Sequence, residues 1–185
     1  MAQYNGYVDV AHNTYDAFRS ATLGNGYNVD NQDYNQCWDF CALLWHQYGL
    51  TLITKAGGGT ARECWTNSRY ANAVPPFTSL EGRENILRGD CVVFWNGDPN
   101  SAGHIAFADQ DWADNNNGYL NFLGQNQGQG IYAPSNIASL NTNIVIGIFR
   151  NTNWNGTPPE PPISYGKMPA LPIVTAINYW WNDEE

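Results

Sequence analysis

The spacing of apolar residues changes part-way along this chain of 185 residues, and that change limits the folds open to it. Before residue 88 the apolar residues recur at helical spacing, most clearly between Cys37 and Gly49. After Asp90 the pattern becomes that of short, β-prone runs, which occupy residues 91–95, 104–108, 119–123 and 144–150. Helices followed by strands predict the α+β class, with N-terminal helices packed on a small antiparallel sheet.

Composition changes again near the C-terminus, where prolines cluster. The run TPPEPP at residues 157–162 is typical of a stiff, extended linker. Beyond it an aromatic cluster, YWW, precedes an acidic end, DEE. We therefore expect one compact domain over residues 1–154, a proline-rich linker over 155–172, and a tail over 173–185 that is too short to fold alone.

A formal net charge of −9 bears on the partners of the chain. This negative charge would repel a polyanion, so nucleic-acid binding is not expected. No stretch is apolar for long enough to span a membrane, so membrane insertion is not expected either. The first residues, MAQYN, lack the basic and apolar regions of a secretory signal, which indicates synthesis in a cytosol and release by another factor.

Four cysteines occur in the chain, and their spacing excludes the usual zinc pattern because no CxxC pair is present. The missing signal favours reduced thiols. Cys64 lies in a short helix-like run and Cys91 in a buried-strand pattern, so both are expected to act as small buried hydrophobes. Cys37 and Cys41 remain as candidates for chemistry.

Cys37 stands at the expected start of a helix, where a thiol has a physical advantage. The free N–H groups of the first turn and the helix dipole favour a negative sulfur, and the thiolate is the nucleophile. The same groups can hold the oxyanion that forms when a carbonyl is attacked, so the Cys37 amide N–H and the Gln36 side chain are candidate donors. Cys41 lies one turn further in, away from the free N–H groups, and is the weaker candidate.

An imidazole and an amide follow the thiol in the chain. His104 begins a strand-like run after Gly103, and Asn126 follows a later strand. A thiol that attacks, an imidazole that moves protons and an amide that fixes the imidazole together make a nucleophilic site. Each residue also has a structural interpretation, since buried cysteines, strand histidines and turn asparagines are common. The catalytic hypothesis therefore requires Cys37, His104 and Asn126 to meet in space.

The order of four motifs resembles that of the CHAP family, the cysteine, histidine-dependent amidohydrolases/peptidases of bacterial cell-wall lysis. The motifs are QCWD at 36–39, RGDCVVF at 88–94, GHIA at 103–106 and FLGQNQG at 122–128. The resemblance covers roughly residues 10–150 and is strongest to endolysin domains of phages that infect Gram-positive, notably streptococcal, hosts. It implies a papain-like α+β fold with a small antiparallel sheet or half-barrel, and cleavage of an amide bond in peptidoglycan.

The resemblance also implies roles for individual residues. Cys37 takes the position of the nucleophile, His104 that of the base, Asn126 that of the orienting residue and Gln36 that of the oxyanion support. Several relatives carry a glutamate two positions before the asparagine, where this chain has Gly124. The missing carboxylate leaves the third catalytic role open between Asn126 and another acid.

Oxygen-bearing residues are dense in the segment before and just after Cys37, and they suggest a calcium site. Calcium takes six to eight oxygen ligands from carboxylates, amides and carbonyls. Alternate spacing in a curling loop would let the side chains of Asn28, Asp30 and Asp39 converge with the carbonyls of Gln32 and Tyr34. Some CHAP endolysins resemble this pattern, with aspartate at the position of Asn28. The alternative is an ordinary polar turn rich in Asn and Asp.

These observations predict a peptidoglycan hydrolase, either an N-acetylmuramoyl-L-alanine amidase or an endopeptidase, used in phage lysis. We expect it to await release to the cell wall in the host cytoplasm or to be carried on a virion tail, as a monomer or part of a larger lytic protein. Two other functions remain open. Abundant Trp, Tyr, Asn and Gln would also suit a non-catalytic cell-wall-binding module. A cysteine peptidase or transglutaminase-like enzyme that acts on protein is the other alternative.

Overall fold

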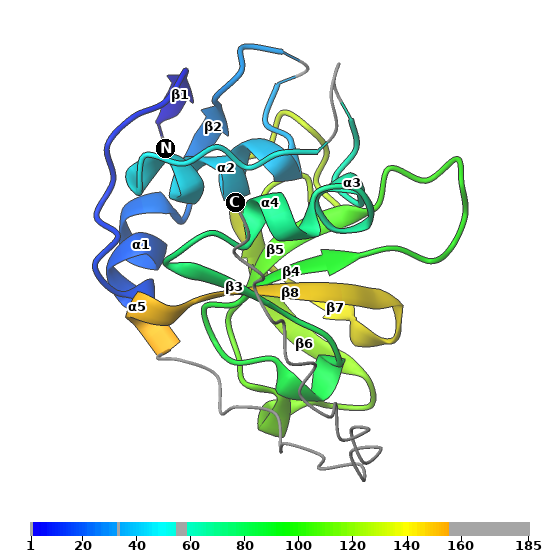
Figure 1. Cartoon of the computed structure of the whole chain (residues 1–185). Helices are drawn as coiled ribbons and strands as arrows, with labels where there is room; N and C mark the ends of the chain where they lie inside the picture. The colour runs from blue at the N-terminus through cyan, green and yellow to red at the C-terminus, as the bar shows by residue number, and fades with distance from the viewer. Residues whose placement is uncertain (1, 33, 55–58, 156–185) are drawn as a thin grey trace, which may run out of the picture.

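The computed structural model describes residues 2–32, 34–54 and 59–155, and within them the chain has the expected α+β architecture. Figure 1 shows helices α1 to α4 gathered on one side of a curled sheet. Residues 156–172 of the predicted linker and the whole predicted tail, 173–185, lie outside the described residues. None of the helices in the described part of the chain has the length and apolar character needed to cross a membrane.

Two helices carry most of the helical packing. The first, α1 (Tyr15–Thr22), begins after Thr14, whose hydroxyl accepts a hydrogen bond from the Ala17 N–H at 3.1 Å. The second, α2 (Cys37–Gln47), is buried along almost its whole length. Three single-turn helices complete the set: α3 (Glu63–Thr66), α4 (Arg69–Asn72) and α5 (Thr152–Asn155).

Six antiparallel strands form the main sheet, in the order β3-β8-β4-β5-β6-β7. Their bounds are β3 Phe77–Leu80, β4 Cys91–Phe94, β5 His104–Ala108, β6 Tyr119–Gly124, β7 Asn136–Asn141 and β8 Val145–Asn151. A separate parallel pair joins β1 (Gln3–Asn5) to β2 (Gly26–Asn28). Three 3-10 turns, at Arg83–Asn85, Trp112–Asp114 and Thr142–Ile144, connect the strands.

Both faces of the sheet are buried along its central strands. Successive side chains of a strand point to opposite faces, and consecutive residues of these strands are buried. Val93 and Ile105 belong to the cluster that contains α2, whereas Val92 and Ala106 belong to a second cluster on the opposite face. By this alternation His104 shares its face with Ala106, while the Cys37 side chain belongs to the helix side. The thiol and the imidazole therefore meet at the end of the sheet, where β5 begins.

The sequence predicted the central elements closely and missed the two edge strands of the main sheet. Helix α2 starts at the expected residue, and β5 has the expected bounds. Strands β3 and β7 were not expected, and they add one strand at each edge of the sheet. The confirmed class is α+β with an antiparallel sheet that is larger than predicted.

Candidate active site

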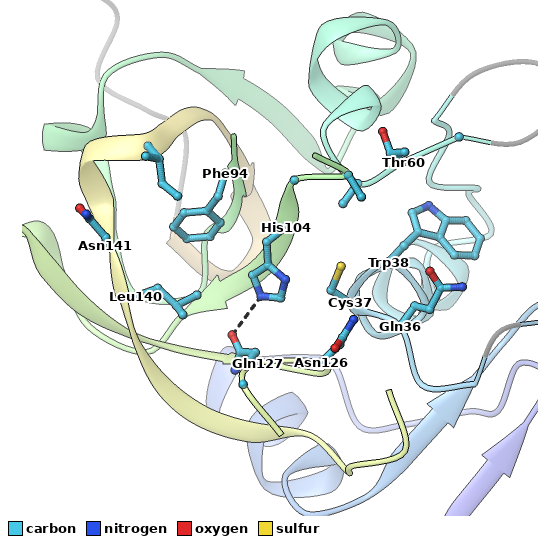
Figure 2. Close-up of a pocket in the computed structure, with 16 residues that line it drawn as sticks. Gln36, Cys37, Trp38, Thr60, Phe94, His104, Asn126, Gln127, Leu140 and Asn141 are labelled. Carbon is cyan, nitrogen blue, oxygen red and sulfur yellow. Dashed lines mark hydrogen bonds between the residues drawn. The ribbon is translucent and has the colours of Figure 1, made fainter. Parts of the chain in front are cut away.

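A cleft of about 460 Å³ opens where the N-terminal end of α2 meets the start of β5. Figure 2 shows the labelled side chains around it, with Cys37 and His104 in the middle. Its other walls come from residues 59–61, the turn 126–128 and the segment 140–144. The cleft therefore brings together segments that are far apart in the sequence.

Cys37 is the first residue of α2, and its side chain is almost buried, at 8% exposure. Burial by itself would raise the pKa of the thiol. The positive charge of His104, a hydrogen bond with its ring, and hydrogen bonds from the backbone N–H groups of Ile105 and Trp38 outweigh burial and lower that pKa below its ordinary value. The helix start thus supplies one N–H to the sulfur, and the strand supplies another.

His104 is the first residue of β5, and it pairs with Phe94 of β4. Burial alone would lower the pKa of its ring, but the negative charge of Cys37 and hydrogen bonds with Cys37 and Gln127 raise it above the ordinary value. Opposite shifts of the two groups favour a thiolate beside an imidazolium. The predicted pairing of Cys37 with His104 is present in the structure.

The amide that contacts the histidine is not the predicted one. The His104 Nε2 lies 3.3 Å from the Gln127 Oε1, as the dashed line in Figure 2 shows. Asn126 lines the same cleft with a left-handed backbone (φ 55°), but among the described residues His104 bonds to Gln127 in its place. The contact expected between Asn126 and the ring is therefore corrected to Gln127, and a catalytic role for Asn126 stays a prediction.

Gly124 occupies the position where relatives were expected to carry an acid. A Cβ built at Gly124 would lie 3.0 Å from both the Cδ and the Oε1 of Gln127, and 3.1 Å from the Cβ of Ala106. These distances are shorter than ordinary van der Waals contact. The Gln127 side chain thus fills the space that a longer residue at position 124 would need.

Gln36 borders the cleft and immediately precedes Cys37 at the start of α2. Its backbone N–H donates to the Asp39 carboxylate at 3.0 Å, which fixes the residue at the helix start. Its carbonyl accepts a hydrogen bond from the Gln125 side chain at 3.2 Å. The geometry keeps Gln36 and the Cys37 N–H at the cleft, and their service to an oxyanion stays a prediction.

The predicted calcium loop folds around the Asp39 carboxylate. Asp39 is fully buried, and one of its oxygens accepts from the Val29 N–H at 2.8 Å and the Asp30 N–H at 3.4 Å. Burial raises the pKa of Asp39 to about 7, and the negative charge of Asp30 adds to the rise. The Asp30 carboxylate accepts from the Gln32 N–H at 2.8 Å, so the two acids lie in one loop.

The oxygens of the remaining predicted calcium ligands differ in whether they already accept hydrogen bonds. Asn28 Oδ1 is buried and has no hydrogen-bond partner among the residues that the structure describes. The Tyr34 carbonyl accepts from the Gln36 N–H at 3.0 Å and retains a second lone pair. Within the described residues no group of three or more His, Cys, Asp or Glu could hold a metal. A cation here would depend on amide and carbonyl oxygens beside the acids, and the orphaned Asn28 oxygen fits that requirement.

Several residues of the cleft were not anticipated from the sequence. Phe94, Leu140 and Ile144 contribute apolar groups to the cleft. Figure 2 shows Thr60 on the opposite side of His104 from Phe94 and Leu140. Gly103 precedes the histidine with φ 71°, and a Cβ there would lie 2.6 Å from the Phe94 carbonyl oxygen. The sequence placed Phe94 in a strand-like run and missed the strand that carries Leu140, and the cleft that these residues share arises only from the tertiary fold.

No protein-family model matches the chain. In sequence, the chain is 33% identical over 116 residues to a protein of Streptococcus phage B30 named D-alanyl-L-alanine endopeptidase. That alignment covers 62% of this chain and 25% of the phage protein, so the chain spans about a quarter of the length of this relative.

In fold, the chain is similar to the crystal structure of the wild-type endolysin LysIME-EF1, with a TM-score of 0.59. The match covers 74% of this chain and 63% of that one, at 18% sequence identity. The sequence match agrees with the expected resemblance to phage lytic enzymes, and the structural match confirms the α+β fold.

Proposed function

We propose that this chain is the catalytic domain of a cysteine-dependent peptidoglycan hydrolase that cleaves an amide bond in the Gram-positive cell wall. The contact between Cys37 and His104 in an open cleft carries this proposal. The resemblance to an endopeptidase of a streptococcal phage and to an endolysin structure supports the substrate class.

The proposed reaction has two stages. The Cys37 thiolate attacks the carbonyl carbon of the amide, and the Cys37 N–H and the Gln36 side chain stabilise the oxyanion. The His104 imidazolium then donates its proton to the departing amine, which leaves a thioester on the sulfur. His104 next takes a proton from a water molecule, which hydrolyses the thioester and restores the thiolate.

The shape of the cleft bears on which amide is cleaved. Phe94, Leu140 and Ile144 line the same cleft as His104, and such apolar residues suit a small alkyl side chain. Alanine offers a methyl group of this kind, and the name of the phage B30 relative refers to a bond between D-alanine and L-alanine. The bond that an N-acetylmuramoyl-L-alanine amidase cleaves also carries an alanine methyl group, so the apolar residues suit both reactions, and the name of this relative leads us to favour an endopeptidase.

Purified streptococcal cell walls test the proposal directly. The wild-type chain should lower the turbidity of the walls and release new amino groups, whereas Cys37→Ala should release none while it keeps its circular dichroism spectrum. Mass spectrometry of the fragments then identifies the cleaved bond. Binding to walls without release would favour the wall-binding alternative, and release from casein would favour a protein peptidase. Lysis by folded Cys37→Ala would refute the assignment.

We also propose that the loop before α2 binds Ca²⁺ through Asn28, Asp30 and Asp39, with carbonyls of Gln32 and Tyr34. The buried, unpartnered Asn28 Oδ1 supports a ligand at this position. When bound, the ion would link the loop to the helix that begins at Cys37, because Asp39 belongs to the first turn of α2. Its effect would therefore fall on stability and on the placement of the nucleophile.

Calorimetry with CaCl₂ or EDTA tests the calcium proposal. Saturating calcium should raise Tm by about 5 °C for the wild type, since a ligand that binds only the folded state stabilises it. Asp30→Asn should reduce this difference, and Asp114→Asn, at another exposed aspartate, should leave it unchanged. Equal Tm and equal activity in both buffers would contradict the proposal.

The site of action follows from the proposed substrate. We propose that the protein reaches the wall either after release from the host cytoplasm or as a module of a virion tail. Immunodetection in purified virions would support the tail module. Accumulation in infected cells with none in virions would support an endolysin.

A further inference from the structure

The amide of Gln127 is held in one orientation by the ends of two strands. Its Nε2 donates to the carbonyl of Phe122 at 3.1 Å and to the carbonyl of Asn136 at 2.9 Å. Both hydrogens of the NH₂ group are therefore used. A flipped amide would place its oxygen against two carbonyl oxygens, so the Oε1 is confined to the side that faces His104.

An oxygen fixed in this way accepts and cannot donate, and this decides which nitrogen of His104 carries the proton. Nε2, at 3.3 Å from the Oε1, must be the N–H donor. Figure 2 shows the other ring nitrogen on the side of the Cys37 sulfur. In the neutral ring that nitrogen, Nδ1, is then the free base, which is the form that can take a proton from the thiol.

We propose that Gln127 is the positioning residue of this site, setting the tautomer and the ring orientation of His104 through an amide locked by two backbone carbonyls. This inference rests on the proposed function, which gives the tautomer its importance. Gln127 acts through His104 and is distinct from the Asn126 expected from the motif.

Gly124 completes the arrangement because it leaves room for the glutamine. The backbone of Gly124 is not left-handed, so another residue could adopt its conformation. Space is the obstacle, since an added Cβ would lie 3.0 Å from Gln127 Cδ and Oε1. Gly124→Ala should therefore displace the Gln127 amide and weaken its contact with His104 while Gln127 itself is retained.

Nitrogen-15 NMR of the histidine rings measures the tautomer directly. The chain has three histidines, so the His104 signals can be assigned with single variants of His12 and His46. A Cys37→Ala background removes the thiolate and makes the readout independent of activity. At a pH where the ring is neutral, Cys37→Ala should hold His104 in the Nε2–H form. Adding Gln127→Met should shift the ratio of tautomers by about fivefold toward Nδ1–H, as loss of one hydrogen bond predicts.

Gln125 provides a matched control. Like Gln127 it is buried, and its amide bonds to backbone groups of Tyr27 and Gln36, but within the described residues no hydrogen bond joins it to His104. Gln125→Met should lower Tm and leave the His104 tautomer ratio unchanged. Gly124→Ala should shift the ratio in the same direction as Gln127→Met, and it covers the case in which Gln127→Met fails to fold.

With Cys37 intact, Gln127→Met should lower the maximal rate of amino-group release from walls by about 10- to 100-fold, the usual cost of losing a residue that orients a histidine. The concentration of walls at half-maximal rate should change little. Folded Gln127→Met and Gly124→Ala proteins with the wild-type tautomer ratio would overturn the inference. Failure of the wild type to cleave walls would instead refute the proposed function, with the tautomer result still measurable.

Discussion

Cys37 and Cys41 lie one turn apart on α2, and the fold shifts the pKa values of their thiols in opposite directions. Burial raises the pKa of Cys41 well above its ordinary value, and a hydrogen bond with Cys91 and electrostatic repulsion from the neighbouring cysteines raise it further. Burial acts on Cys37 too, but the His104 charge and two backbone N–H groups reverse its effect and lower that pKa.

Position on the helix explains the difference between these two chemically identical groups. The first turn of a helix has N–H groups without intrahelical partners, and Cys37 accepts from one of them. One turn later those groups are engaged in the helix, and Cys41 faces other thiols in the core. The same residue type is thus a candidate nucleophile in one place and a packing residue in the next.

Thiol reactivity should show the largest contrast between them. At pH 7 iodoacetamide should modify Cys37 at least about 100-fold faster than Cys41, because the thiolate reacts and Cys41 is both neutral and fully buried. Peptide mapping by mass spectrometry resolves the two sites. Comparable rates in the folded protein would contradict the comparison.

Removal of the His104 imidazole should reduce the difference in reactivity between Cys37 and Cys41 by slowing the reaction of Cys37. The pKa of Cys37 is lowered partly by the His104 charge, so in His104→Ala the midpoint of its alkylation profile should move to higher pH. A rise of one pKa unit reduces the thiolate about tenfold at any pH below both midpoints. Stopped alkylation reactions between pH 5 and 9 measure the shift, and an unchanged profile would mean that His104 does not influence the thiol.

Stability should reverse the ranking of the two cysteines. Cys41→Ala removes a fully buried sulfur from the core and should lower the free energy of unfolding by about 1 kcal/mol, whereas wall hydrolysis persists. Cys37→Ala should cost about 0.5 kcal/mol or less, because its side chain borders an open cleft. Urea denaturation monitored by tryptophan fluorescence compares them, and a larger loss for Cys37→Ala would contradict this ranking.

Among these changes, added salt should have the smallest effect on the reactivity of Cys37. Cys37 is buried and His104 is partly buried, so added ions screen the pair less than they screen exposed charges. Raising NaCl from 0.1 to 0.5 M should change the alkylation rate of Cys37 by less than about twofold. A steep decline with salt would indicate that the pair is solvated.

The sequence predicted those parts of the molecule whose signals are local. Helix α2 could be located because a polar loop precedes an apolar stripe, and β5 because a β-prone run follows Gly103. Strand β3 was missed because it directly follows Pro75 and Pro76, which indicated only a break. Strand β7 was missed because its residues are mostly half-exposed and it begins and ends with asparagine.

The proposed catalytic residues show the same restriction to local sequence signals. Cys37 and His104 could be chosen from motifs because each stands at the start of its own element. Gln127 could not, since its contact with His104 depends on a side chain that reaches back across a turn and is held by β6 and β7. Motif order selected the neighbouring Asn126, and only tertiary geometry distinguishes the two.

Gly103 restricts how this cleft could be altered by protein engineering. The loop of residues 96–102 leads into the cleft at Ala102 and is a natural segment to exchange with that of another hydrolase. Its junction with the strand runs through Gly103, where any side chain would collide with the backbone of the neighbouring strand. A chimera that carried a larger residue at this junction would misplace the histidine next to it, so a donor loop has to bring a glycine with it.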